Sequence, residues 1–139
     1  MTTNKILIVD VDGTVAIRHG RKPFEWKKIS EDRPNQKIIE LINRVASTGI
    51  SIVFLTGREN MYREVTASWL KQYFDFPFRL FCRTDSDQRA DEVIKFEIFE
   101  TELRDSYEII AVLDDRNKVV KMWREKAGLV CLQVAEGDF

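Results

Sequence analysis

The chain has 139 residues, 44% of them hydrophobic, which suits one domain with a sizeable core. Its 22 basic and 23 acidic residues nearly cancel, so the net charge argues against general binding to DNA or to a membrane surface, and an anionic partner would need a local cluster of Arg and Lys. No apolar run approaches the ~18 residues of a membrane span, no signal peptide is evident and both cysteines lie in apolar runs, so we expect a soluble protein in the reducing cytoplasm.

Strand-like and helix-like segments alternate along the chain. Five short runs rich in Ile, Val, Leu or Phe have the composition of strands covered on both faces: residues 5–11, 50–56, 79–83, 109–113 and 129–134. Helical patterns lie between them, at residues 35–47, 59–73, 89–103 and 117–127. This order predicts a single α/β domain of three layers, doubly wound, with a mostly parallel five-stranded sheet and right-handed crossovers.

Residues 14–33 interrupt this alternation. Inserted loops of such length are usually functional or disordered. The segment is basic and carries these charged or titratable side chains: Arg18, His19, Arg21, Lys22, Lys27 and Lys28. We expect a basic loop or flap near the active site, and its aromatic residues Phe24 and Trp26 either stack on a nucleobase or pack the loop against the domain.

Acidic residues gather where the predicted strands end. Asp10 and Asp12 close the first strand in the sequence IVDVDGT, and Asp114 and Asp115 close the fourth. Ligands of open α/β sheets bind at the carboxyl ends of the strands, so the four carboxylates should converge there. Without a cation they would repel one another, and a hard divalent ion, Mg²⁺, makes the arrangement favourable. His19 is the only histidine, which gives a zinc site or a His-based triad little support.

The same residues suggest phosphoryl transfer through a carboxylate nucleophile. Asp10 could attack phosphorus to form an aspartyl-phosphate, and Asp12 could protonate the leaving oxygen and later deprotonate water. Gly13 permits a tight turn after the two acids, and backbone N–H groups there can hold phosphate oxygens. Thr56 and Gly57 would supply a hydroxyl and an N–H group at a helix entry.

A cation is also needed for the phosphate oxygens, and Lys95 is the best candidate. It lies in the predicted helix 89–103 among apolar neighbours, where a merely solvated lysine would be less at home.

The order D-V-D-G-T, T-G-R, a helical lysine and D-D resembles the four-motif signature of the haloacid dehalogenase-like phosphatase superfamily and extends over nearly the whole chain. The stretches R-A-D-E-V-I-K-F-E-I-F, L-D-D-R-N-K-V-V-K-M-W-R and Q-V-A-E-G-D-F are similar to the 3'-phosphatase domain of phage-type polynucleotide kinase-phosphatase. The Gly-rich G-x-x-x-x-G-K-[ST] loop of the kinase half does not occur in the sequence. The resemblance implies a haloacid dehalogenase-like fold with a minimal cap or none.

For the acids, the resemblance implies specific roles. Asp10 matches the nucleophile and Asp12 the general acid–base, whose main-chain carbonyl is expected on the metal. Asp114 and Asp115 match the metal-site acids, one a direct ligand and the other further out, and the order of the two stays open. The implied magnesium site is therefore formed by Asp10, Asp12, Asp114 and Asp115.

Further positions carry over in the same way. Thr56 replaces the usual Ser of the second motif, and Lys95 takes the place of the lysine of the third. Arg21 and Arg58 coincide with arginines that bind substrate phosphate, and Asp91 coincides with an acid that orients the lysine. The expected substrate-binding residues are therefore Arg21 and Arg58, together with Gly13 and Gly57 through their N–H groups. The segment after Arg58 is shorter than in the family, so the resemblance does not define how the substrate strand is bound.

We therefore predict a Mg²⁺-dependent phosphatase that removes 3'-phosphates from DNA or RNA ends during nucleic-acid repair, with a possible separate kinase or ligase partner and no membrane. A small-molecule phosphatase, for nucleotides or sugar phosphates, is the open alternative. A signalling receiver domain uses similar groups, but it needs an acid after the third strand, where this chain has Phe81, Cys82 and Arg83.

Overall fold

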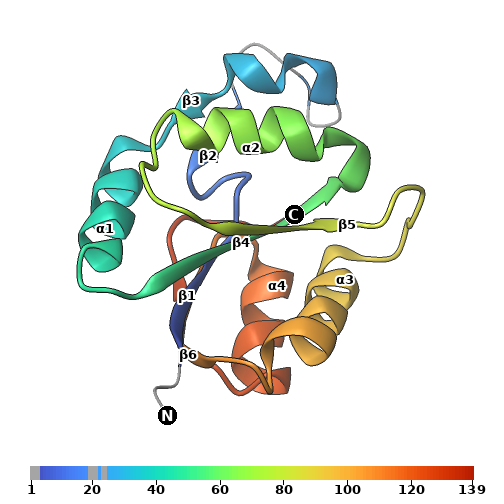
Figure 1. Ribbon diagram of the computed structural model, residues 1–139. Coiled ribbons are helices and arrows are strands. Elements are labelled where there is room, and N and C mark those ends of the chain that lie inside the picture. The colour runs from blue at the N-terminus through green and yellow to red at the C-terminus, as the bar shows by residue number, and fades with distance from the viewer. Residues whose placement is uncertain (1–3, 19–21, 23–24) are drawn as a thin grey trace.

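The computed structural model describes residues 4–18, 22 and 25–139, without the side chains of residues 26–28. Its central sheet contains five parallel strands in the order β5-β4-β1-β6-β7 (Figure 1). Their bounds are Lys5–Val9 for β1, Ser51–Glu59 for β4, Arg79–Arg83 for β5, Glu108–Asp114 for β6 and Cys131–Gln133 for β7. The prediction of a five-stranded parallel sheet is confirmed.

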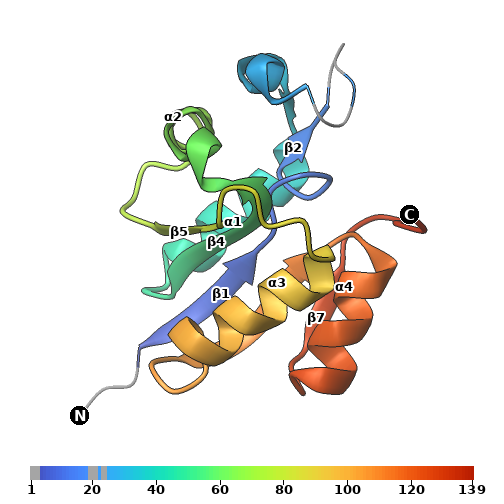
Figure 2. The ribbon, with the colours of Figure 1, turned by 90° about the vertical axis from the view of Figure 1, so that its right-hand side faces the viewer.

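Helices cover both faces of this sheet. α1 (Gln36–Ala46) and α2 (Arg63–Lys71), which follows the short helix η2 (Asn60–Tyr62), lie on one face. α3 (Asp91–Ile98) and α4 (Asn117–Lys121) lie on the other, and each continues as a π-helical turn, η3 (Phe99–Leu103) and η4 (Met122–Lys126) (Figure 2). The predicted three-layer α/β fold is therefore correct.

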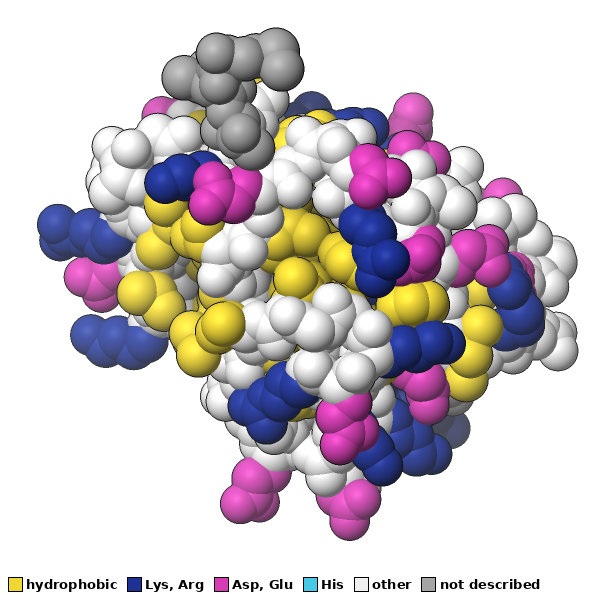
Figure 3. All heavy atoms as spheres, turned by 90° about the horizontal axis from the view of Figure 1, so that it is seen from below, with side chains coloured by type: hydrophobic (Ala, Val, Ile, Leu, Met, Phe, Trp, Pro, Cys, Tyr) yellow, Lys and Arg dark blue, Asp and Glu magenta, His cyan; other side chains and the backbone are white. Residues whose placement is uncertain are grey.

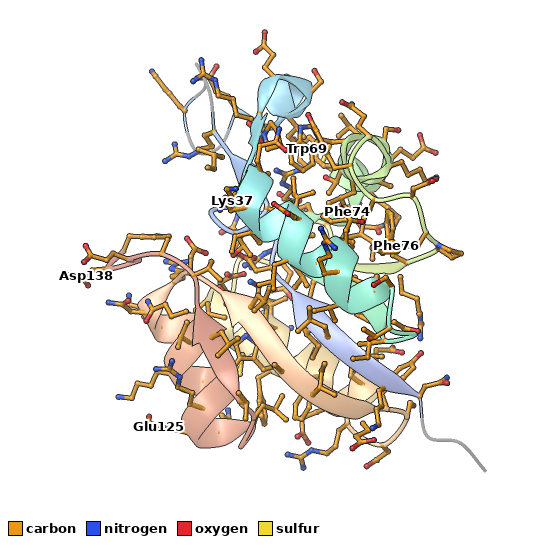
Figure 4. The ribbon with its side chains drawn as sticks, turned by 90° about the vertical axis from the view of Figure 1, so that its left-hand side faces the viewer. Lys37, Trp69, Phe74, Phe76, Glu125 and Asp138 are labelled. Carbon is orange, nitrogen blue, oxygen red and sulfur yellow. The ribbon has the colours of Figure 1, made fainter. Side chains whose placement is uncertain are left out.

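Two apolar cores flank the sheet because successive side chains of a strand point to opposite faces. In β1, Leu7 and Val9 join the core beneath α1 and α2, whereas Ile6 and Ile8 join the core beneath α3 and α4. The first core also holds or contacts the aromatic side chains labelled beside α1 in Figure 4: Trp69, Phe74 and Phe76. This alternation decides which face each residue beyond the strands approaches.

The chain reverses its direction of travel across the sheet at β1. It passes from β1 to β4 and β5 on one side, then returns to β6 and β7 on the other side. Ligands of doubly wound sheets bind at such a reversal, outside the carboxyl ends of the strands. Asp10 is the residue that follows β1, so it stands at this position.

The insertion after β1 is partly regular structure. β2 (Ala16–Ile17) and β3 (Arg33–Pro34) form a short antiparallel ladder, and the 3₁₀ helix η1 (Trp26–Glu31) lies against α2. Trp69 of α2 donates a hydrogen bond from Nε1 to the carbonyl of Asp32, at 3.0 Å. Residues His19, Arg21 and Phe24 lie outside the described part of the chain.

The face of the molecule seen from below in Figure 3 carries side chains of both charges. In Figure 3, acidic and basic side chains are interspersed around a mainly hydrophobic centre. Within the described residues, no helix is long and apolar enough to cross a membrane. The cytoplasmic location stays a prediction.

The two cysteines are free thiols. Cys131 is buried and Cys82 is half-buried. Burial raises the pKa of the Cys131 thiol to about 12.

Candidate active site

A buried ion cluster lies under the carboxyl end of β1. The ammonium of Lys95 donates to Asp10 Oδ1 at 2.7 Å and to Asp114 Oδ2 at 3.1 Å, and it lies 3.6 Å from Asp91 Oδ2. Asp10 and Asp114 are 6% and 1% exposed, and Lys95 is 1% exposed, so water screens these charges little. We call Lys95, Asp10, Asp114 and the neighbouring Asp115 the Lys95 cluster.

The strand pleat explains why these residues meet. Asp10 follows Ile6 and Ile8 at intervals of two, so it points to the face covered by α3. Asp114 follows Val112 in the same way at the end of β6. Lys95 lies in the second turn of α3, on the helix that covers this face. The sequence expectation for Lys95 thus corresponds to a side chain directed at Asp10.

Asp114 is held by several donors. Its Oδ1 accepts from the backbone N–H of Asp115 at 2.8 Å, and its Oδ2 accepts from Trp123 Nε1 at 3.3 Å as well as from Lys95. Trp123 is fully buried in η4. Its indole N–H therefore fixes the carboxylate that the ammonium approaches.

The electrostatics of the Lys95 cluster favour an added cation. Burial raises the pKa of Asp10 well above its usual range, with a further rise from Asp114, and Lys95 opposes both effects only in part. Burial also raises the pKa of Asp115. Burial alone would lower the pKa of Lys95, but the negative charges of Asp10, Asp114 and Asp91 raise it. The ammonium therefore stays charged, and the buried carboxylates of Asp10 and Asp114 share it with the half-buried Asp91.

The donor set fits a hard divalent ion. Oxygen atoms of Asp10, Asp114 and Asp115 lie within 4.8 Å of one another, and all three residues are buried. Carboxylate oxygens are the protein ligands that Mg²⁺ prefers. These three residues could therefore hold Mg²⁺. The predicted contribution of Asp12, through its main-chain carbonyl, stays a prediction.

A second cluster surrounds the buried guanidinium of Arg58. Its Nε and Nη2 donate to the two carboxylate oxygens of Asp12 at 2.9 and 2.7 Å, which is a bidentate pair. Nη2 also contacts Asp32 at 3.1 Å, and Nη1 donates to the hydroxyl of Thr66 at 2.9 Å. We call Arg58, Asp12, Asp32 and Thr66 the Arg58 cluster. Asp12 retains 31% exposure and can still meet a ligand.

The turn after Asp10 requires its small residue. Gly13 has φ +82°, and a Cβ there would lie 2.1 Å from Asp115 Oδ2. The turn brings the hydroxyl of Thr14 to 3.1 Å from Asp10 Oδ2, to which it donates. Thr14 is fully buried. Because Lys95 donates to the other oxygen, Asp10 accepts hydrogen bonds on both carboxylate oxygens.

Thr56 and Gly57 lie within β4, which continues to Glu59, so the expectation of a helix entry at this point is wrong. The strand continues because its pairing with β5 resumes at Glu59 and Arg83. Thr56 is buried and its hydroxyl accepts from the N–H of Arg58 at 3.1 Å.

Asp91 lies against Gly57, where a Cβ would approach Asp91 Oδ1 to 2.3 Å. That oxygen is buried and accepts no hydrogen bond from the residues that the structure describes, although Arg83 Nη2 lies 3.5 Å away. Its carboxylate therefore lies between Arg83 and Lys95.

A cavity of about 600 Å³ opens above both clusters. Most predicted site residues line it or lie directly beneath it, and Arg21 falls outside the described residues. Its lining includes Asp10, Asp12, Gly13, Gly57, Asp91, Asp114 and Asp115. On the rim lie Ile17 and Arg18 from the insertion, and Arg116 and Phe139.

Four residues that make hydrogen bonds in the two clusters were not predicted from the sequence: Thr14, Asp32, Thr66 and Trp123. Thr14 belongs to the D-V-D-G-T motif, so its position relative to Asp10 was a usable signal. Asp32 is one of three acids in the basic segment, with Glu25 and Glu31, and nothing in the sequence distinguishes it from the other two. Thr66 and Trp123 lie on helices whose patterns indicate only packing.

Comparisons with solved structures support the same geometry. A chain in the structure of the Pnkp1/Rnl/Hen1 RNA repair complex is 38% identical and superposes with a TM-score of 0.93 over 99% of this chain and 44% of that chain. A second structure of the Pnkp1/Rnl/Hen1 complex gives 37% identity and a TM-score of 0.93, covering 99% of this chain and 48% of the other. The class C acid phosphatase from Bacillus anthracis with tungstate bound, at 13% identity and a TM-score of 0.56 over 83% of this chain and 53% of that chain, shares the fold alone.

A viral relative and a family model complete the comparison. A protein of Autographa californica nuclear polyhedrosis virus, provisionally named a bifunctional polynucleotide kinase/RNA ligase, is 32% identical over 124 residues, which are 87% of this chain and 18% of that protein. The chain thus spans less than half the length of these repair-protein relatives. The model described as the polynucleotide kinase PNKP phosphatase domain matches residues 4–139, so the chain belongs to this family of haloacid dehalogenase-like phosphatase domains.

Proposed function

We propose that this domain is a Mg²⁺-dependent phosphatase that removes 3'-phosphates from nucleic-acid ends through an aspartyl-phosphate on Asp10. The observation that carries the proposal is the placement of Asp10, which accepts from Lys95 at 2.7 Å and from Thr14 at 3.1 Å at the floor of an open cavity. Two donors orient its carboxylate while burial keeps water from screening it.

The chemistry divides between the two acids. Asp10 attacks phosphorus, the bond from phosphorus to the 3'-oxygen breaks, and Asp12 delivers a proton to that oxygen. Asp12 then takes a proton from a water molecule, which attacks phosphorus and releases inorganic phosphate and the Asp10 carboxylate. The bidentate pair with Arg58 holds Asp12 in place for both proton transfers.

The other groups serve charge and position. Lys95 would offset the negative charge of Asp10 and supply positive charge near the transferred phosphoryl group. Asp91 would orient the ammonium of Lys95. Mg²⁺, when bound by Asp10, Asp114 and Asp115, would supply positive charge for the phosphate oxygens. The backbone N–H of Gly57 and the hydroxyl of Thr56 would contact the phosphate. The N–H of Gly13 already donates to the carbonyl of Ala16 at 2.9 Å, so Gly13 would serve the site through its turn.

An open site and the repair relatives favour a polymer end as substrate. Ile17 and Arg18 of the insertion line the cavity, and the insertion would act as a basic flap. RNA is the first polymer to test, because the solved relatives come from an RNA repair complex. A kinase or ligase, in the same chain or separate, would act on the end that this domain prepares.

A substrate panel tests the proposal. RNA and DNA oligonucleotides with a 3'-phosphate, a 3'-mononucleotide and a sugar phosphate would be compared with Mg²⁺ and with EDTA. We expect the oligonucleotides to have the highest kcat/KM and EDTA to abolish turnover. Equal or better turnover of the small phosphates would instead support the small-molecule phosphatase.

A further inference from the structure

The segment that follows β7 is tied to the strand end that carries the active-site acids. The N–H of Val134 donates to the carbonyl of Asp114 at 3.0 Å, and Gln133 Nε2 donates to the carbonyl of Asp115 at 2.9 Å. The N–H of Asn117 donates to the carbonyl of Gly137 at 2.8 Å. Figure 4 shows this segment, with Asp138 labelled, leaving the sheet on the side away from α1. These hydrogen bonds hold residues 134–139 beside the ends of β6 and β1, and Phe139, the last of them, lines the cavity.

An exposed aromatic ring stands at the end of this segment. Phe139 is 61% exposed, yet it lines the cavity together with Asp10 and Asp12. The guanidinium of Arg116 lies over its ring at 5.2 Å from the centroid, and Arg116 Nε donates to the main-chain oxygen of Phe139 at 2.8 Å. The ring is thus held beside the cavity while much of its surface faces solvent.

A second arginine–phenylalanine pair in the chain shows what a purely structural pair looks like. Arg104 lies over the ring of Phe99 at the same distance of 5.2 Å, but Phe99 is only 2% exposed and packs in the core beneath α3. Phe139 has the same cation contact without the burial. Packing therefore explains Phe99 and leaves the exposed position of Phe139 unexplained.

We propose that Phe139 is a stacking platform for the nucleobase of the 3'-terminal nucleotide, and that Arg116 pairs with a phosphate of the same strand. This inference rests on the proposed function and names the recognition element of that site. Aromatic rings bind bases of any sequence, which suits an enzyme that acts on ends. Among the side-chain nitrogens of Arg116, only Nε donates to another residue in the described part of the chain, so the two terminal nitrogens can bind a phosphate.

A binding experiment tests the platform without turnover. The full chain with Asp10→Asn is titrated with a 3'-phosphorylated RNA oligonucleotide whose last base is 2-aminopurine. We expect its fluorescence to be quenched on binding, and Phe139→Ala to weaken binding by about 5- to 100-fold, the usual range for loss of one stacked base. Phe139→Trp should restore both quenching and affinity, and Val130→Ala, at a 63% exposed site before β7, is the control.

Kinetics with an abasic 3'-terminal nucleotide separate stacking from other effects. Wild type should prefer the base-containing oligonucleotide to the abasic one, and Phe139→Ala should remove that preference. Equal use of both by wild type, or a preference that survives in Phe139→Ala, would overturn the platform and leave the 3'-phosphatase proposal standing. Failure of wild type to hydrolyse any 3'-phosphorylated oligonucleotide would overturn the proposed function, and the quenching data would still decide whether the ring stacks on a base.

Discussion

The Lys95 cluster and the Arg58 cluster meet at one cavity but solve different problems. Arg58 is enclosed by directed hydrogen bonds from all three of its nitrogens to Asp12, Asp32 and Thr66. Lys95 has a single ammonium for several buried carboxylates, and the pKa of Asp10 is raised by burial despite it. A guanidinium can fix a neighbouring acid through its planar geometry, whereas an ammonium mainly supplies charge.

The Arg58 cluster fixes the position of an acid, whereas the Lys95 cluster sets the charge around another. The Arg58 cluster joins the insertion, β4 and α2, so it fixes Asp12 relative to three elements. The Lys95 cluster remains rich in negative charge, and oxygen atoms of Asp10, Asp114 and Asp115 lie close enough together to hold a cation. Substitutions in the two clusters should therefore have different effects on activity and stability.

The largest expected effect follows from Asp10→Asn. An amide cannot form the acyl phosphate, so kcat for a 3'-phosphorylated oligonucleotide should fall by about a thousandfold or more. The fold should persist, because Asn retains the shape and removes a charge from an acid-rich cluster. Steady-state kinetics and circular dichroism measure the two effects. Turnover at the wild-type rate would refute Asp10 as the nucleophile.

The second largest expected effect is a loss of stability in Lys95→Met. Removing the ammonium leaves buried carboxylates without their partner, which should cost roughly 3 kcal/mol of unfolding free energy in EDTA. Urea denaturation measures this, with Lys121→Met, whose side chain is 75% exposed, as the control. A loss as small as that of the control would mean that the cluster does not depend on its ammonium.

Much of the Lys95 cluster was predictable because it follows from regular structure. The apolar runs located the strands, and the strand ends located Asp10 and Asp114. The helix pattern around Lys95 placed it on a covered face. These inferences need only the periods of strands and helices and the rule for ligands at a chain reversal.

The Arg58 cluster was not predictable in the same way. Its partners Asp32 and Thr66 come from an insertion and from the middle of a helix, where no period indicates a contact with Arg58. The family resemblance implies that Arg58 binds substrate phosphate, and that stays a prediction. What the structure adds is that its guanidinium already holds Asp12.

Arg58→Lys should separate these two roles. Lysine keeps the charge but loses the bidentate pair, so proton transfer by Asp12 should slow and kcat should fall by about 30-fold. With p-nitrophenyl phosphate, whose leaving group needs no proton, the initial burst should persist and only the later steady rate should fall. Arg104→Lys, at an exposed side chain, is the control. A rise in KM alone, with kcat retained, would instead favour substrate binding by Arg58.

The smallest effect is a thermal shift with Mg²⁺, and it tests the charge imbalance of the Lys95 cluster directly. A ligand at about ten times its Kd stabilises the folded state by about 1.4 kcal/mol, which for a domain of this size raises Tm by roughly 4 °C. Asp115→Asn should remove most of that shift, because its carboxylate faces Asp10 across the turn at Gly13. Asp75→Asn, an exposed acid after α2, should retain it. If both variants shift like wild type, Mg²⁺ binds elsewhere, and the excess of carboxylates around Lys95 would have to be offset by protonation alone.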